Sequence, residues 1–196
     1  MDYRINQREL IEIIRAWNSY FKRKIHFIAC GGTAMTLLGV KESTKDIDFM
    51  VPDIKEYDYL IKILKQLGYS QKTGWGWSKP NEPFIFDFFP GKRIHTTELL
   101  ESPMIENRHS LFKEFSKIYV GILNDYDLIT SKLMRGASVD FNDCLLLVKM
   151  KNKEIDINRL RNHFYELASY DVAEDRLKGH WPSFERLLKE ENLYAG

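Results

Sequence analysis

The chain has 196 residues, of which 44% are hydrophobic and 29% are charged, and its formal net charge is +1. These proportions are ordinary for a globular protein with a substantial core, and the near-zero charge excludes a strong overall field toward nucleic acid or membrane. No signal peptide, long apolar run, repeat or low-complexity tract is present in the sequence, so we expect a cytoplasmic protein without a membrane partner.

Two helices are predicted in the first seventy residues. Asn6 and Glu9 have capping-box spacing before an apolar repeat of helical period, and Asp53 and Glu56 repeat the device before a second helix that Gly68 ends. Strands are expected at 25–30, 46–51, 84–90 and 117–122. Between the last helix and the third strand, residues 70–83 read as a loop or frayed hairpin, whose tryptophans we expect to pin it on the core.

The pattern changes near Asn124 and Asp125, from mixed strand and helix to helix alone. We therefore predict a core domain at 1–123 and a helical domain at 124–196. In the second part, residues 125–136 read as a helix that places Lys132 and Arg135 on one face. Asp140 is expected to be the N-cap of the next helix, and Asp143 is expected to hold Arg135 in position.

Three acids stand in or beside apolar, strand-like runs. Asp46 and Asp48 alternate with Ile47 in the strand predicted at 46–51, so both carboxylates point to one face, and Asp87 lies in the apolar run 84–89. A buried carboxylate is costly unless it is paired or binds a metal. If the two strands are neighbours, the three acids form a site for Mg²⁺ next to substrate phosphates.

A phosphate site is predicted just upstream of these acids. A buried strand ends at Gly31 and Gly32, and Thr33 opens a short helix. Paired glycines let the backbone approach a ligand closely, and the Thr33 hydroxyl and the free N–H groups of a helix N-terminus are donors to a phosphate. Other interpretations stay open: solvated or capping acids at 46 and 48, a structural ion pair at Asp87, and a simple tight turn at the glycines.

The motif made of Gly31-Gly32-Thr33 and the run from Gly39 to Asp48, which ends in Asp46-Ile47-Asp48, resembles the nucleotidyltransferase superfamily of DNA polymerase beta type. Within it, the chain is similar to small stand-alone prokaryotic enzymes related to AbiEii and MenT toxins. The resemblance covers residues 25–90, continues more loosely to Lys132 and Arg135, and implies a mixed α/β (α+β) fold with a β-sheet flanked by helices and an all-helical C-terminal part.

The resemblance also implies the site. Asp46, Asp48 and Asp87 would be catalytic and would bind Mg²⁺ or Mn²⁺. The nucleotide would be bound by Gly31, Gly32, Thr33, Thr44, Lys132 and Arg135.

The expected activity is transfer of a nucleoside monophosphate from an NTP such as ATP to an acceptor hydroxyl. By resemblance the acceptor would be a tRNA 3′ end or a protein, as in a toxin–antitoxin or phage-defence system with an antitoxin partner. A small-molecule acceptor, as in antibiotic nucleotidyltransferases, is the main alternative. A non-catalytic nucleotide-binding module and a metal-dependent hydrolase using the same acids stay open as well.

Overall fold

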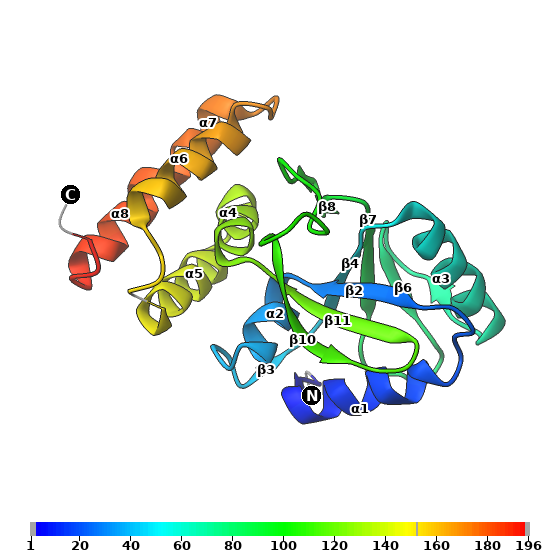
Figure 1. Cartoon of the computed structure of the whole chain (residues 1–196). Helices are drawn as coiled ribbons and strands as arrows, with labels where there is room; N and C mark the ends of the chain where they lie inside the picture. The colour runs from blue at the N-terminus through cyan, green and yellow to red at the C-terminus, as the bar shows by residue number, and fades with distance from the viewer. Residues whose placement is uncertain (1–2, 152, 195–196) are drawn as a thin grey trace. The chain divides into compact units, whose positions relative to one another are not determined.

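The computed structural model describes residues 3–151 and 153–194, and the chain divides into two compact units, Met1–Asn124 and Asp125–Gly196. Unit 1 combines strands and helices, and unit 2 consists of helices in the part described (Figure 1). No helix among the described residues is long and apolar enough to cross a membrane.

Unit 1 is organised around one mixed seven-stranded sheet with the strand order β10-β11-β2-β4-β7-β6-β5. Its strands are β2 (Ile25–Ala29), β4 (Ile47–Val51), β5 (Ser70–Gln71), β6 (Gly76–Ser78), β7 (Phe86–Pro90), β10 (His109–Glu114) and β11 (Ile118–Leu123). The β11–β2 and β4–β7 pairs are parallel and the others are antiparallel. The predicted mixed sheet flanked by helices is therefore confirmed. The segment 70–83, expected to be a loop or frayed hairpin, supplies the edge strand β5 and its neighbour β6.

Two short ribbons accompany the sheet. They are β1 (Ile5–Asn6) with β3 (Ser43–Thr44), and β8 (Arg93–Ile94) with β9 (Thr97–Glu98). The helices described in unit 1 are α1 (Gln7–Asn18), α2 (Gly31–Leu37) and α3 (Ile54–Gln66).

The helix caps follow local sequence. Asn6 caps α1, and its side chain and that of Glu9 complete the predicted capping box. Asp53 caps α3 as predicted, accepting the N–H groups of Lys55 and Glu56. The Glu56 carboxylate departs from the predicted box, because it accepts bonds from the backbone N–H and ring of His26 on β2.

An aromatic core lies on one face of the sheet. Phe86 and Phe88 of β7 stack at a ring-centroid distance of 6.0 Å, and Trp17 of α1 packs on both, with centroids 4.5 and 5.8 Å away. Trp77 of β6 is 4% exposed, so it pins the 70–83 segment as expected. Because neighbouring residues of a strand point to opposite faces, Asp87 faces away from this core.

Unit 2 contains α4 (Asp125–Arg135), α5 (Ser138–Met150), α6 (Ile157–Ala168), α7 (Glu174–Lys178) and α8 (His180–Glu190). Its core holds Phe164 of α6 and Trp181 and Phe184 of α8, all at most 1% exposed. The Trp181 ring contacts those of Phe164 and Phe184 at centroid distances of 5.9 and 5.8 Å, and its contact with Phe164 joins α6 to α8.

Candidate active site

A row of carboxylates lies on the face of the sheet opposite the aromatic core. Asp48 on β4 is in register with Asp87 on the parallel neighbour β7, so their side chains share this face. Asp48 is 7% exposed, and Asp87 is half-buried. Asp46 is exposed and lies one residue before β4, because the pairing of β4 with β7 begins only at Ile47. The sequence pattern had placed Asp46 inside the strand.

The surroundings of Asp87 disfavour its charged form. Burial raises the pKa of Asp87 to about 6, and the negative charge of Asp46 acts in the same direction. Asp46 and Asp87 are therefore close enough to repel each other. A cation placed between them would relieve that repulsion.

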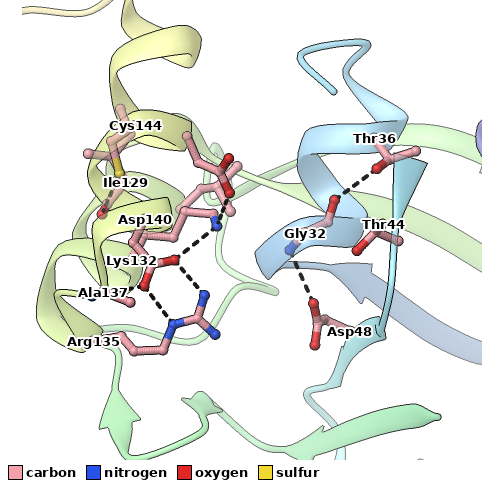
Figure 2. A network of polar contacts seen from close by, with 12 residues as sticks. Gly32, Thr36, Thr44, Asp48, Ile129, Lys132, Arg135, Ala137, Asp140 and Cys144 are labelled. Atoms are coloured by element: carbon pink, nitrogen blue, oxygen red, sulfur yellow. Dashed lines mark hydrogen bonds and ion pairs between the residues drawn. The ribbon is translucent and has the colours of Figure 1, made fainter. Parts of the chain in front are cut away.

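The backbone at the start of α2 approaches Asp48 closely. The Gly32 N–H donates to Asp48 Oδ2 at 3.1 Å, as Figure 2 shows. A Cβ atom on Gly31 would lie 2.5 Å from the same oxygen, and Gly31 has a φ of +54°. Only glycine therefore fits at position 31, for reasons of both space and conformation. The helix begins at Gly31 rather than at Thr33, so both glycines belong to its first turn.

Two threonine hydroxyls converge on the backbone that carries the acids. Thr33 Oγ1 donates to the Asp46 carbonyl at 3.3 Å and accepts the Asp48 N–H at 2.8 Å. Thr44 Oγ1 donates to the same carbonyl at 3.0 Å. Both side chains are buried, and each hydroxyl has a single proton, so both protons are directed to Asp46 instead of to a phosphate. In this structure the two hydroxyls fix the backbone between Asp46 and Asp48.

Within unit 2, four charged side chains of α4 and α5 form a network: Lys132, Asp140 and Asp143 are buried and Arg135 is exposed. Figure 2 labels Lys132, Arg135 and Asp140. Lys132 Nζ, 3% exposed, donates to Asp143 at 2.8 Å and to Asp140 at 3.3 Å. Arg135 Nε donates to Asp140 at 2.7 Å, and its second bond to the same carboxylate makes the pair bidentate. Lys132 and Arg135 together therefore balance the charges of two buried carboxylates of their own unit.

The pKa values follow from this pairing. Burial alone would lower the pKa of Lys132, but the hydrogen bond and charge of Asp143 and the charge of Asp140 outweigh it and raise the pKa. For Asp140, burial acts upward, but the bonds and charges of Arg135 and Lys132 outweigh it and lower the pKa. Lys132 and Asp140 are thus held in their charged forms at neutral pH.

The prediction that Asp140 is an N-cap is wrong. Helix α5 begins at Ser138, and its N-cap residue is Ala137. Asp140 occupies the third helical position, and its carboxylate accepts the Ala137 N–H at 3.3 Å in addition to the bonds from the two cations. This carboxylate therefore bonds both the N-terminal backbone of α5 and the two cations of α4.

The acid row fits a hard divalent cation by the chemistry of its donors, because carboxylate oxygens are the ligands that Mg²⁺ prefers. Among residues 3–151 and 153–194, no three His, Cys, Asp or Glu side chains stand close enough together to form a preassembled metal site. Asp48 and Asp87 are the pair that the sheet register aligns, and Asp46 is the third carboxylate within electrostatic range.

Gly76 is a neighbour of the row that the sequence reasoning did not single out. It lies opposite Asp87 in the antiparallel β6–β7 pair, and a Cβ on it would come within 3.1 Å of Asp87 Oδ1. The sequence feature that could have indicated it is the alternation of glycine and tryptophan at 74–77. That alternation is equally typical of a simple loop.

Comparison with known proteins gives the family context. The model of a family described as nucleotidyltransferase of unknown function (DUF6036) matches residues 8–187. The crystal structure of ANT(2″)-Ia in complex with adenylyl-2″-tobramycin is similar, with a TM-score of 0.54 and 14% identity over 82% of this chain and 95% of that chain. A solution structure of ANT(2″)-Ia is also similar, with a TM-score of 0.51 and 14% identity over 93% of this chain and 94% of that chain.

An antigenic nucleotidyltransferase-like protein from Paracoccidioides brasiliensis has a TM-score of 0.47 and 11% identity, over 91% of this chain and 95% of that chain. No curated protein matches the chain. At such low identities the two ANT(2″)-Ia structures show a shared fold.

Proposed function

The chain belongs to the nucleotidyltransferase family DUF6036, and from that premise we propose that it moves a nucleoside monophosphate from an NTP to an acceptor hydroxyl with Mg²⁺ as cofactor. One observation carries the proposal. Asp48 and Asp87 lie in register on neighbouring parallel strands, and the charge of Asp46 acts on Asp87.

In the proposed reaction, the acceptor oxygen forms a bond to the α-phosphorus and the bond from that phosphorus to the bridging oxygen of pyrophosphate breaks. Asp87 takes the proton of the acceptor hydroxyl. Its register position opposite Asp48, on the neighbouring strand, puts it beside the proposed metal site, where an acceptor hydroxyl would lie within reach of its carboxylate. Gly31 and Gly32 bind the β- and γ-phosphates by close backbone approach.

Thr33 and Thr44 act on the nucleotide indirectly in this proposal. Their hydroxyls hold the Asp46 carbonyl, and Thr33 also holds the Asp48 N–H, so they set where the two acids lie. The direct roles predicted for Lys132 and Arg135 in nucleotide binding stay predictions.

Asp46, Asp48 and Asp87 would hold the cation. A bound Mg²⁺ would lower the pKa of the acceptor hydroxyl and neutralise the charge that develops on the phosphates. Mn²⁺, which also suits carboxylate ligands, is expected to replace it.

A small molecule is the acceptor class with structural support. ANT(2″)-Ia, whose fold this chain shares, was crystallised with an adenylylated tobramycin. The tRNA and protein acceptors, the toxin role and the antitoxin partner rest on the sequence resemblance alone and stay predictions. A cytoplasmic location is likewise a prediction.

The direct test incubates the protein with each α-³²P-labelled NTP, Mg²⁺ and a panel of acceptors comprising tobramycin, total RNA and cell protein. The Asp46→Ala/Asp48→Ala double variant is the control. We expect one acceptor to be labelled by the wild type and by no control reaction. Labelled nucleoside monophosphate without a labelled acceptor would identify a hydrolase, and binding of NTP without any turnover would identify a non-catalytic module.

A further inference from the structure

The carboxylate of Asp87 lacks a support that the carboxylate of Asp48 has. Asp48 Oδ2 accepts the Gly32 N–H, whereas no hydrogen bond to the Asp87 carboxylate occurs within residues 3–151 and 153–194. A carboxylate that binds a cation is usually held by a hydrogen bond from a residue that does not touch the ion. If Asp87 binds the cation of the proposed function, on which this inference rests, one of its neighbours is expected to supply such a donor.

Three side chains converge over Gly76, which lies opposite Asp87 in the β6–β7 pair. A Cβ atom on Gly76 would lie 2.4 Å from Thr73 Oγ1, 2.8 Å from a methyl carbon of Ile85 and 3.1 Å from Asp87 Oδ1. The space that a side chain at position 76 would take is therefore filled by these three. Because their atoms lie close to one point, the Thr73 hydroxyl and the Asp87 carboxylate are neighbours.

The turn before β6 holds the Thr73 hydroxyl in this place. Thr73 Oγ1 accepts the Gly76 N–H at 2.9 Å, and the Gly76 carbonyl accepts the N–H groups of Lys72 at 2.8 Å and Thr73 at 3.4 Å. A hydroxyl accepts through its lone pairs and still has one proton to donate. No acceptor takes this proton in the part of the chain that the structure describes. The turn thus holds an uncommitted donor beside a carboxylate that has no donor.

The composition of the cluster leaves one acceptor for that donor. The side chain of Ile85 is a hydrocarbon, so of the side chains that meet over Gly76 only that of Asp87 can accept the Thr73 proton. Glycine at position 76 permits the arrangement, because any Cβ there would have to displace Thr73 or Ile85. The glycine on β6 therefore brings a hydroxyl to the acid row, whereas Gly31 and Gly32 on the other side bring backbone.

We propose that Thr73 is a positioning residue for Asp87. When the cation binds at the acid row, the Thr73 hydroxyl donates to Asp87 Oδ1, and the other carboxylate oxygen is left for the cation. The terminal torsion of an aspartate is soft, so the carboxylate turns toward this donor at little cost in energy. Thr73 Oγ1 keeps the Gly76 N–H as its own donor, so no bond of the turn has to break. Thr73 itself touches neither the cation nor the nucleotide.

The test measures Mn²⁺ affinity from the electron paramagnetic resonance of the free ion. Thr73→Val removes the hydroxyl and keeps the shape of the side chain, and Thr73→Ser keeps the hydroxyl. Gln71→Ala is the matched control, because Gln71 Nε2 holds the same turn by donating to the Gly74 carbonyl at 2.7 Å. Asp87→Asn, alone and combined with Thr73→Val, completes a double-mutant cycle. Thermal unfolding checks that each variant folds, and Thr73→Ala replaces Thr73→Val if the valine variant does not fold.

We expect Thr73→Val to weaken Mn²⁺ binding about tenfold, which is typical for the loss of a residue that holds a metal ligand. Thr73→Ser and Gln71→Ala should bind Mn²⁺ as the wild type does. Asp87→Asn should weaken binding by itself, and adding Thr73→Val to it should change the affinity no further, because the hydroxyl acts through the Asp87 carboxylate.

An unchanged Mn²⁺ affinity in Thr73→Val would overturn the inference. Equal losses in Thr73→Val and Gln71→Ala would do so as well, since they would assign the effect to the turn as a whole, and so would a loss that persists in full in the Asp87→Asn background or that Thr73→Ser fails to restore. Each of these results leaves the proposed function standing. A wild type whose Mn²⁺ affinity is unchanged by Asp48→Asn would contradict the proposed function and this inference together.

Discussion

Replacing Asp87 by asparagine should make the protein more stable at neutral pH while removing its activity. Burial and the charge of Asp46 raise the pKa of Asp87 from 3.8 to about 6, so the folded state holds the proton of this carboxyl more tightly than the unfolded state does. The resulting penalty is absent below about pH 4, grows between about pH 4 and pH 6, and is complete above that range. The asparagine side chain carries no charge at any pH, so the unfolding free energy of the variant is not reduced in this way.

The size of the effect follows from the pKa shift. A change of one pKa unit corresponds to about 1.4 kcal/mol, so the shift of Asp87 sets an upper limit of about 3 kcal/mol. Because the carboxyl is only half-buried, solvent screening reduces the expected gain to about 1–2 kcal/mol. No hydrogen bond to this carboxylate occurs in the part of the chain that the structure describes. The asparagine variant therefore loses no hydrogen bond among those residues.

The assay is urea unfolding of the wild type and Asp87→Asn at pH 8 and at pH 4, with metal chelated by EDTA. Asp58→Asn, which changes an exposed acid of α3, is the matched control and should behave as the wild type does. We expect the gain at pH 8 and none at pH 4, and added Mg²⁺ should stabilise the wild type more than the variant. Equal stability at pH 8, or the same gain at both pH values, would refute the electrostatic reasoning.

Three further substitutions test other parts of the account. Thr33→Val keeps the shape of the side chain but leaves the buried backbone N–H of Asp48 without its acceptor. This variant should lose about 1–3 kcal/mol of unfolding free energy and bind Mn²⁺ more weakly. Thr33→Ser keeps the hydroxyl and should restore both properties. Lys132→Met should cost about 3–5 kcal/mol in urea unfolding because it removes the buried cation that bonds Asp140 and Asp143, while Lys149→Met at a surface ion pair should cost at most about 1 kcal/mol. Asn6→Ala should cost about 1 kcal/mol by removing a helix cap, and an unchanged melting temperature would contradict the capping assignment.

Local features of the fold were predictable from the sequence because short-range chemistry determines them. Asn6 and Asp53 cap their helices by bonding N–H groups two or three residues away, so the residue types and spacing suffice. The strand at β4 follows from an apolar run, and its pairing with β7 satisfies the condition under which Asp48 and Asp87 would share a face.

Long-range contacts account for the parts that the sequence did not reveal. Glu56 bonds His26 from thirty residues away instead of completing a capping box. Asp140 accepts bonds from Arg135 and Lys132 on α4 as well as from the N–H of the N-cap residue, so its role depends on how α4 and α5 pack and not on a cap alone. Such partners are chosen by which side chains the fold brings together, and spacing along the chain does not encode them.

The most direct test of the central claim, that the acid row is the site of nucleotidyl transfer, is a crystal structure with Mn²⁺ and a non-hydrolysable NTP analogue, measured for anomalous scattering. The account predicts a Mn²⁺ peak within coordination distance of carboxylate oxygens of Asp48 and Asp87, with the triphosphate against Gly31 and Gly32. A metal–nucleotide complex bound away from these carboxylates, with the row empty, would contradict it.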